Sequence, residues 1–344
     1  MRRLAILPAS DPDGERGAIA VLVAILMVAL LGFAAIAVDV GMLYAERAQL
    51  RNGADAGAFA IAQKCAKNLN DPDCSATSSL PGSLANGNAG DGLTNVQSVA
   101  LDKLNRTVTV AAGAQETGKA PNKMSLFFAR VLGFKDATVT AAATVQWGRP
   151  VAGPTAFPIA FSVCQVNDRI GVGAQLLVSH GSKTEASCNY VPSGQVVPGG
   201  FGWLKRPDGG CAGNVSASGW SDGDPGNSYP KICDDQLISW ASDISAGKDV
   251  TVLLPIFDQV TGTGSSVSYH LMSFAAFKVQ GWSFNGNKFP ITFRNAPPDV
   301  SPALSCTGSC VGVIGSFVRY VSLDNAYTLG TSPDFGAGVI KLTQ

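Results

Sequence analysis

The longest apolar stretch of the chain lies near its beginning, at Ala18–Val38, and contains no charged residue. Because an α-helix rises about 1.5 Å per residue, this run would span roughly 31 Å, close to the hydrocarbon thickness of a bilayer. No other window of the chain is comparable. The pattern therefore predicts one transmembrane helix at 18–38, preceded by a cytoplasmic tail at 1–16.

A cleavable secretory signal is the alternative interpretation of this run. Arg2 and Arg3 supply a charged start, and Ala35-Ile36-Ala37 has the small-x-small form of a cleavage site, so cleavage after Ala37 stays open. The run is longer than the usual apolar core of a signal peptide, which favours retention as an anchor. Basic residues lie on both sides of the run, so the positive-inside rule barely chooses an orientation.

All cysteines of the chain follow the apolar run, and their number is even, which favours an oxidising compartment and an extracytoplasmic C-terminal region. The sequence does not fix their connectivity, but short-range closure favours four disulfides: Cys65–Cys74, Cys164–Cys188, Cys211–Cys233 and Cys306–Cys310. A zinc site is disfavoured because there is no C-x-x-C and both histidines lie far from any cysteine. We expect no metal site and no cofactor.

Apolar and small residues continue at helical spacing from Asp39 to Lys67, which predicts that the membrane helix extends into solvent. Small side chains such as Ala54 and Ala58 let a neighbouring helix approach closely, so we expect this face to contact a partner helix. A carboxylate at the end of a membrane helix needs water or a partner. Asp39 is therefore either a contact with a neighbouring assembly component or a solvated interfacial residue.

Three segments of this region occur in a recognisable order: Gly17-Ala18-Ile19-Ala20, Val38-Asp39-Val40-Gly41 and Leu50-x-Asn52-x-Ala54-Asp55-Ala56-x-Ala58-x-Ala60. Together they resemble the TadG-like N-terminal domain of bacterial Flp pilus-assembly proteins, which we place at 17–68. The resemblance implies a membrane-anchored accessory or structural component of a Flp (Tad) type pilus-assembly or secretion system. It implies contacts with other pilus-assembly membrane proteins through Asp39, Asn52 and Asp55.

Beyond the helix, residues 69–93 are rich in Ser, Gly, Pro and Asn and predict a linker. Two alternating segments, a helical one at 124–132 and a third alternating one predict a small ββαβ unit at 94–148. Phe127 and Phe128 are expected in the core of this unit, with an exposed docking patch as the alternative. Gly133 is expected as the C-cap of its helix.

Prolines at 150–154 suggest a boundary before the last region, 150–344. There, short apolar runs alternate with Gly, Pro, Asn and Asp clusters, which is typical of a sandwich-like, mostly-β domain. One short helix is expected at 237–242. The fold class is therefore α+β, with a long N-terminal helix, a small α/β unit and a disulfide-bonded β-rich domain.

Charge and motifs argue against two function classes. The 25 basic and 25 acidic residues cancel, and no basic block suggests nucleic acid. Gly219-Trp220-Ser221-Asp222-Gly223 matches the nucleophile motif G-x-S-x-G, but its surroundings predict a loop instead of the required strand and helix, so we expect no enzyme. The alternative function is an anchored adhesin or ligand-binding module independent of pili, motivated by Trp203, Trp220 and Trp282 in the glycine-rich exterior.

Overall fold

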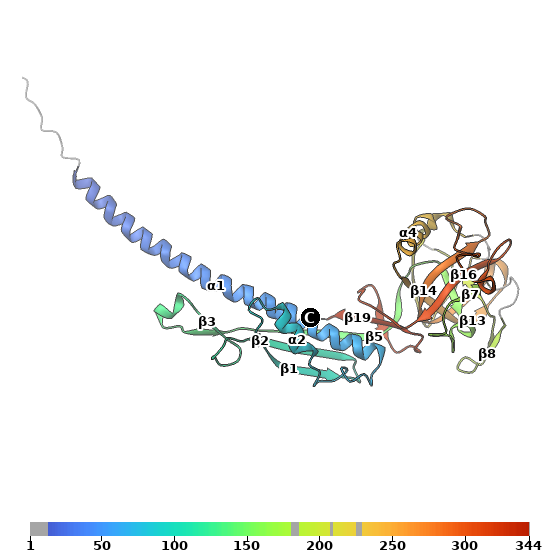
Figure 1. The fold of residues 1–344 in the computed structure, drawn as a ribbon, viewed down its shortest axis with the longest axis horizontal. Coiled ribbons are helices and arrows are strands. Elements are labelled where there is room, and N and C mark those ends of the chain that lie inside the picture. Colours follow the sequence, from blue (N-terminus) through green and yellow to red (C-terminus); the bar gives the residue numbers. More distant parts are fainter. Residues whose placement is uncertain (1–12, 180–185, 207–208, 225–228, 344) are drawn as a thin grey trace, which may run out of the picture. The chain divides into compact units, whose positions relative to one another are not determined.

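The computed structural model describes residues 13–179, 186–206, 209–224 and 229–343, with side chains from residue 19 (Figure 1). The chain divides into two compact units, which are described separately. Unit 1 contains the first helix as far as Gly57, together with Ser79–Val99 and Val110–Ala143. Unit 2 contains Ala58–Ser78, Ala100–Thr109 and the residues from Thr144 onward.

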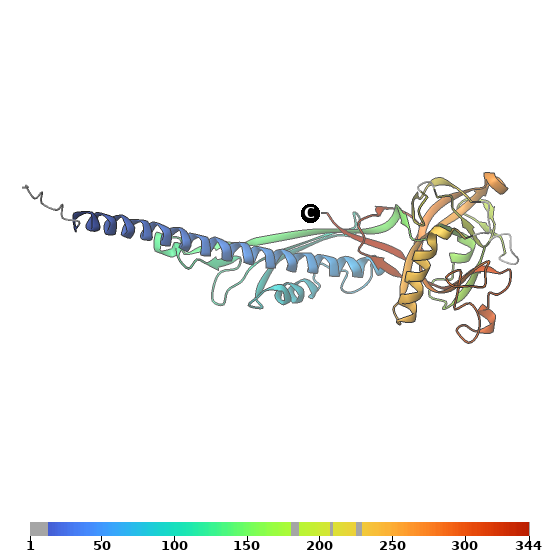
Figure 2. The same ribbon diagram turned by 90° about the horizontal axis from the view of Figure 1, so that it is seen from above.

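The first helix, α1 (Asp13–Lys67), is a single helix of 55 residues (Figures 1 and 2). Its apolar run is exposed on all sides: Val28 and Phe33 are each 71% exposed, and none of the most apolar window is buried. A helix that is hydrophobic all round is stable only in an apolar environment. Within the described residues, α1 is the one helix long and apolar enough to cross a membrane, a property that signal sequences share.

The segment expected to be a linker contains a second helix, α2 (Leu80–Asn88), which packs against α1. A Cβ atom at Gly53 would lie 2.8 Å from Cα of Ala85, and one at Gly57 would lie 3.0 Å from Cα of Pro81. Only glycine therefore allows the two helices to approach so closely. The linker prediction failed here because α2 has poor intrinsic helix propensity and is held by this packing.

The strands of the described residues form two large sheets and two hairpins. One sheet has the order β1-β2-β5-β19-β17, and β11 and β18 also pair with β5. Its strands are β1 (Thr94–Asp102), β2 (Thr107–Ala114), β5 (Thr140–Thr155), β11 (Gly213–Ser216), β17 (Tyr320–Ser322), β18 (Thr328–Gly330) and β19 (Ala337–Leu342). Strand β5 runs through 150–154, where the prolines had suggested a boundary.

The other large sheet lies within unit 2 and has the order β10-β6-β13-β14-β16-β7, with β12 and β15 pairing with β14. Its strands are β6 (Ile159–Ser162), β7 (Gln175–Val178), β10 (Phe201–Trp203), β12 (Gly219–Asp222), β13 (Val250–Thr261), β14 (Ser268–Phe284), β15 (Thr292–Phe293) and β16 (Val311–Val318). The hairpins are β3 (Lys123–Ser125) with β4 (Asp136–Thr138), and β8 (Cys188–Tyr190) with β9 (Gln195–Val197).

The core of unit 2 is rich in aromatic side chains from this sheet, such as Phe161, Phe277 and Trp282, which have no exposed surface. The helix expected at 237–242 is present as α4 (Asp234–Ser245) and buries Leu237 in the same core. The remaining helical turns are α3 (Val163–Val166), η1 (Ala129–Leu132), η2 (Lys231–Cys233), η3 (Gly264–Ser266) and η4 (Pro302–Leu304). The fold is α+β, as the sequence predicted.

All eight cysteines are paired in the short-range pattern that the sequence favoured: Cys65–Cys74, Cys164–Cys188, Cys211–Cys233 and Cys306–Cys310. The first pair fastens the end of α1 to the following turn, and the other three lie in the β-rich region. Each cross-link stabilises the fold mainly by restricting the unfolded chain.

The prediction of a helix at 124–132 is wrong. Strand β3 takes up its beginning, and only the short 3₁₀ helix η1 forms, ending at Gly133 in the left-handed conformation at φ 95°. Phe127 and Phe128 are 59% and 39% exposed, so the prediction that they lie in a core is also wrong. Apolar residues in a sequence indicate that a surface will be shielded from water. They do not show whether the same chain, another protein or lipid shields it.

Candidate functional site

Asp39, the first polar residue after the apolar run, joins α1 to the loop between β3 and β4, and all of these residues belong to unit 1. Its two carboxylate oxygens accept hydrogen bonds from the backbone N–H groups of Phe127 at 2.9 Å, Phe128 at 3.0 and 3.2 Å, and Ala129 at 2.6 Å. These N–H groups lie at the start of η1, where a helix leaves its donors unpaired and favours an anion. Asp39 thus caps η1 from a different element.

Two opposing effects set the pKa of the Asp39 carboxyl. The side chain is only 3% exposed, and burial acts to raise the pKa. The N–H groups of Ala129, Phe128 and Phe127 act in the opposite direction, and together they hold the pKa below its ordinary value. The carboxylate is therefore the stable form at neutral pH.

This geometry corrects one expectation from the sequence. Asp39 was a candidate contact with a neighbouring protein, but its carboxylate is buried and bonded to the backbone of its own chain. The sequence could not reveal this, because the partners of Asp39 lie about 90 positions further along the chain. Asp39 therefore has a structural role within unit 1, where it links α1 to the β3–β4 loop. We call this set of hydrogen bonds the Asp39 tie.

The small-residue face of α1 requires a similar correction. Ala54 and Ala58 have no exposed surface, and Leu50, Ile61 and Ala62 on the same face are equally buried. These positions recur at intervals of three and four residues, as one face of a helix does. The chain itself covers this face, so Ala54 and Ala58 are not available as a docking surface for a partner helix.

The other two family-matched polar positions remain accessible. Asn52 is exposed and Asp55 is half-buried. At about 100° per residue, Asn52 points roughly 200° away from Ala54. Together with Arg51, these residues form the outward polar face of α1, which we name the 51–55 face.

Asp55 is poorly satisfied within its own chain. Among the described residues, its Oδ1 atom is buried without a hydrogen-bond partner. Burial raises the pKa of the Asp55 carboxyl, and the Arg51 guanidinium opposes that rise. A carboxylate in this state costs folding free energy and has unused capacity to accept hydrogen bonds. Asp55 is therefore a polar group that its own chain leaves incompletely hydrogen-bonded.

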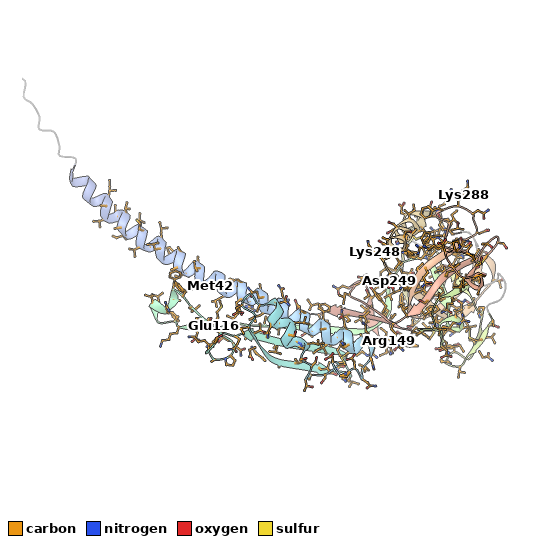
Figure 3. All side chains as sticks on the ribbon, viewed as in Figure 1. Met42, Glu116, Arg149, Lys248, Asp249 and Lys288 are labelled. Atoms are coloured by element: carbon orange, nitrogen blue, oxygen red, sulfur yellow. A yellow bond between two sulfur atoms is a disulfide. The ribbon has the colours of Figure 1, made fainter. Side chains whose placement is uncertain are left out.

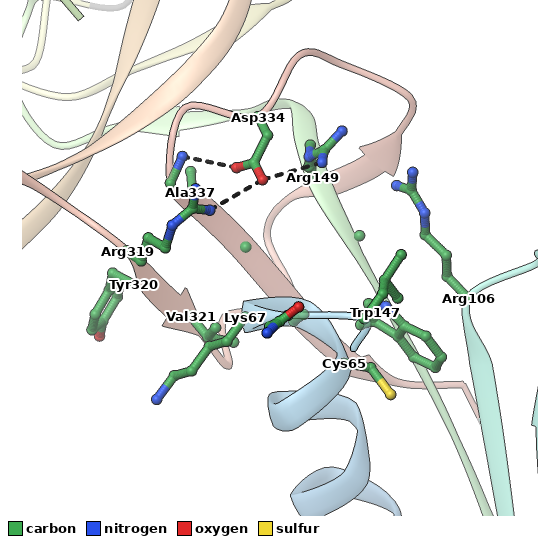
Figure 4. A pocket seen from close by; sticks show the side chains of 16 residues that line it. Cys65, Lys67, Arg106, Trp147, Arg149, Arg319, Tyr320, Val321, Asp334 and Ala337 are labelled. Carbon is green, nitrogen blue, oxygen red and sulfur yellow. Dashed lines mark hydrogen bonds and ion pairs between the residues drawn. The ribbon is translucent and has the colours of Figure 1, made fainter. Parts of the chain in front are cut away.

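A pocket of about 520 Å³ within unit 2 lies beside the end of α1 (Figure 4). Its charged lining converges on Asp334, whose carboxylate accepts from the Gly336 N–H at 3.0 Å and pairs with Arg149 at 3.3 Å and Arg319 at 3.1 Å. Burial acts to raise the pKa of Asp334, but that N–H group and the two arginines hold it below its ordinary value. The cluster has one carboxylate and two guanidinium groups, so its net charge is positive.

Ser221 and His270 lie on adjacent strands but face opposite sides of the sheet. In the register of β12 with β14, Trp220 is opposite His270 and Ser221 is opposite Tyr269. The Trp220 and His270 rings are 5.3 Å apart, and His270 Nδ1 lies 2.6 Å from Asp258 Oδ1. Successive side chains of a strand alternate between faces, so the hydroxyl of Ser221 points away from His270. This arrangement lacks the nucleophile–base contact that a serine hydrolase needs.

Comparison with known proteins gives a family match that covers the candidate site. Residues 17–63 match the model of the Flp pilus-assembly TadE/G-like family, as the resemblance of this segment had indicated. The matched segment contains the apolar run, Asp39 and the 51–55 face. Searches of curated proteins and of solved structures gave no match.

One group of exposed residues was expected mainly in a core, with an exposed docking patch at Phe127 and Phe128 only as the alternative. The loop at 127–134 exposes most of its apolar side chains next to the tie at Asp39. Its composition did contain a signal, because five large apolar residues fall within eight positions that also hold a basic residue. The prediction of a helix with a buried apolar face gave these residues a place in the core, so their exposure was not expected.

Proposed function

We propose that this chain is a single-pass membrane protein that acts as an accessory or structural component of a Flp (Tad) type pilus-assembly or secretion system. The observation that carries the proposal is that one family match covers all of the relevant features of the helix. The family match at 17–63 covers the exposed apolar run, the tie at Asp39 and the 51–55 face.

The exposure of the apolar run supports a lipid environment. Burying one Val, Leu or Ile side chain contributes about 1.5–3 kcal/mol relative to leaving it in water. The run carries many such side chains, including Leu26 at 59% and Leu30 at 65% exposure. Water is therefore an unfavourable solvent for this part of α1, whereas a bilayer matches both its length and its polarity.

The disulfides support an orientation with the β-rich region outside the cytoplasm. Disulfides persist in oxidising compartments and are rare in the cytosol. Four of them occur after the apolar run. In the proposed topology the N-terminus is cytoplasmic, and everything after Asp39 is extracytoplasmic. Its role is non-enzymatic, in line with the separation of Ser221 from His270.

We place the contact with other pilus-assembly membrane proteins on the 51–55 face. Asn52 is exposed there, and Asp55 has an oxygen without a partner among the described residues. A neighbouring protein with hydrogen-bonding groups would contact the exposed side chain of Asn52 and the exposed part of Asp55.

Deletion and complementation test this function directly. An in-frame deletion in the native organism should remove surface Flp-type pili, counted by electron microscopy, and the full chain should restore them. A chain with Asn52→Ala and Asp55→Asn should restore them poorly. Lys67→Ala is the matched control, because Lys67 is exposed on the same helix outside the matched segment, and it should restore pili fully.

Normal pili in the deletion strain would contradict the proposal. The anchored adhesin or ligand-binding module would then become the better explanation. The next experiment would test the purified full chain for binding to surface glycans or host proteins, because a fragment that begins at residue 150 would cut strand β5.

A further inference from the structure

The loop between β3 and β4 is unusually apolar for a surface loop. We call residues 127–134 the apolar loop. Its exposed side chains are Phe127 at 59%, Phe128 at 39%, Val131 at 85%, Leu132 at 69% and Phe134 at 64%. Consecutive exposed apolar residues are costly in water, and in natural proteins they mark an interaction surface.

The tie to Asp39 fixes where this loop lies along α1. The hydrogen bonds to Phe127, Phe128 and Ala129 start from the residue that directly follows the run 18–38. At about 1.5 Å per residue, the loop is therefore within a few ångströms of the end of the proposed span. In Figure 3, Met42 is labelled on α1 beside this hairpin.

Exposed apolar residues lie on the helix next to Asp39 as well as in the loop. On α1, Ile36, Val38 and Val40 are 50%, 49% and 43% exposed around the tie. If lipid covers the run up to Val38, the same lipid surface reaches the level of the apolar loop. Lipid at this level of the helix would therefore shield the apolar loop from water without a partner protein.

The charges around the loop fit the surface of a bilayer. Arg130 and Lys135 are exposed, and neither has an ion pair among the described residues. The Arg130 guanidinium lies 5.4 Å from the centre of the Phe127 ring. Lys123 is paired with Asp136 at 3.0 Å, which leaves the loop with an excess of positive charge. Aromatic and aliphatic side chains beside basic groups are typical of segments that lie in the lipid interface.

We propose that the apolar loop is a second membrane contact, which inserts its exposed side chains into the interface of the leaflet from which α1 emerges. The proposal rests on the proposed membrane span. Arg130 and Lys135 would meet anionic headgroups, and the Asp39 tie would hold the loop at the required depth. Two attachment points fix the rotation of a helix about its own axis, which one span alone leaves free. The 51–55 face would thereby be presented in a constant direction to neighbouring proteins.

The test measures the depth of single labels in the purified full chain. Because all eight native cysteines are in disulfides, one added cysteine can be labelled selectively with an environment-sensitive fluorophore. The variants are Val131→Cys in the apolar loop, Val28→Cys in the run and Leu104→Cys in the β1–β2 turn. Their side chains are 85%, 71% and 90% exposed, so they are matched in accessibility. Each is reconstituted in phosphatidylcholine vesicles, with and without phosphatidylglycerol.

The proposal predicts a blue-shifted emission at position 131 and severalfold stronger quenching by nitroxide-labelled lipid than at position 104. Phosphatidylglycerol should increase that quenching, and Arg130→Gln with Lys135→Gln should remove the increase. A label at 28 that is quenched while the label at 131 behaves like the one at 104 would overturn the membrane contact and point to a protein partner for the loop. Absence of quenching at 28 would instead overturn the proposed span.

Discussion

The two ends of α1 are both apolar in sequence, yet they differ in what covers them. In the run up to Val38, large side chains such as Leu26 and Phe33 are exposed by more than half. Between Leu50 and Cys65, the apolar face includes the small residues Ala54, Ala58 and Ala62 and is covered by the chain itself. Side-chain size separates the two regions. Large apolar residues all round a helix suit a fluid lipid environment, whereas small residues on one face suit close packing against a fixed partner.

The same contrast separates two carboxylates of this helix. Asp39 is buried and fully bonded, with its pKa lowered, whereas Asp55 is half-buried, has an unpaired oxygen and a raised pKa. The first carboxylate stabilises the structure and the second does not. This difference makes the Asp39 carboxylate part of what holds the fold together, whereas the Asp55 carboxylate is not.

The largest effect should come from a charge in the exposed apolar region. Leu26→Arg places a cation near the middle of the run, at a cost of about 2.5–3.5 kcal/mol for insertion. We expect a smaller share of the variant in the membrane fraction, as measured by immunoblotting of fractionated cells. Leu104→Arg, at an exposed apolar position of a turn, should remain in the membrane.

A smaller but clear effect should follow from enlarging a buried alanine. Ala58→Leu must fit extra methylene groups into a face with no exposed surface, which should lower the free energy of unfolding by about 1–3 kcal/mol. Denaturant unfolding in detergent measures the change. Ala48→Leu, at an exposed position of the same helix, should change it by less than about 0.5 kcal/mol. Equal effects at the two positions would contradict the assignment of a packed face.

The Asp39 tie should depend on pH in one direction. Because the folded pKa lies below the ordinary 3.8, the tie contributes stability above that pH and loses it as the pH falls through the lowered value. Spin labels at Tyr44→Cys and Val131→Cys should therefore keep a narrow distance distribution from neutral pH down to about 3.8 and broaden only below it. Broadening that begins well above this pH would count against the tie. Asp39→Asn should broaden the distribution already at neutral pH.

The smallest effect is expected at Asp55. Since burial raises its pKa, the charged form disfavours the folded state at neutral pH, and Asp55→Asn should raise the melting temperature slightly or leave it unchanged. The change in the free energy of unfolding should stay within about 0.5 kcal/mol. Differential scanning fluorimetry measures the corresponding shift of the melting temperature. A marked loss of stability would show that Asp55 has an important partner within the chain.

The sequence predicted what depends on neighbouring residues and missed what depends on distant ones. The apolar run, the family match, the helix α4 and the short-range disulfides all follow from contiguous patterns. The partners of Asp39 and the cover over Ala54 come from distant parts of the chain, and no local pattern reveals them. Helix α2 was missed because its packing against Gly53 and Gly57 outweighs its weak propensity.

The central claim is that the large apolar residues of α1 remain in the protein as a membrane anchor. The most direct test is N-terminal sequencing and intact mass measurement of the protein isolated from native cells, after extraction of the membranes with alkaline carbonate. The account predicts a chain that retains residues 18–38 and stays with the membrane pellet. A mature chain that begins at Val38, released into the soluble fraction, would contradict it.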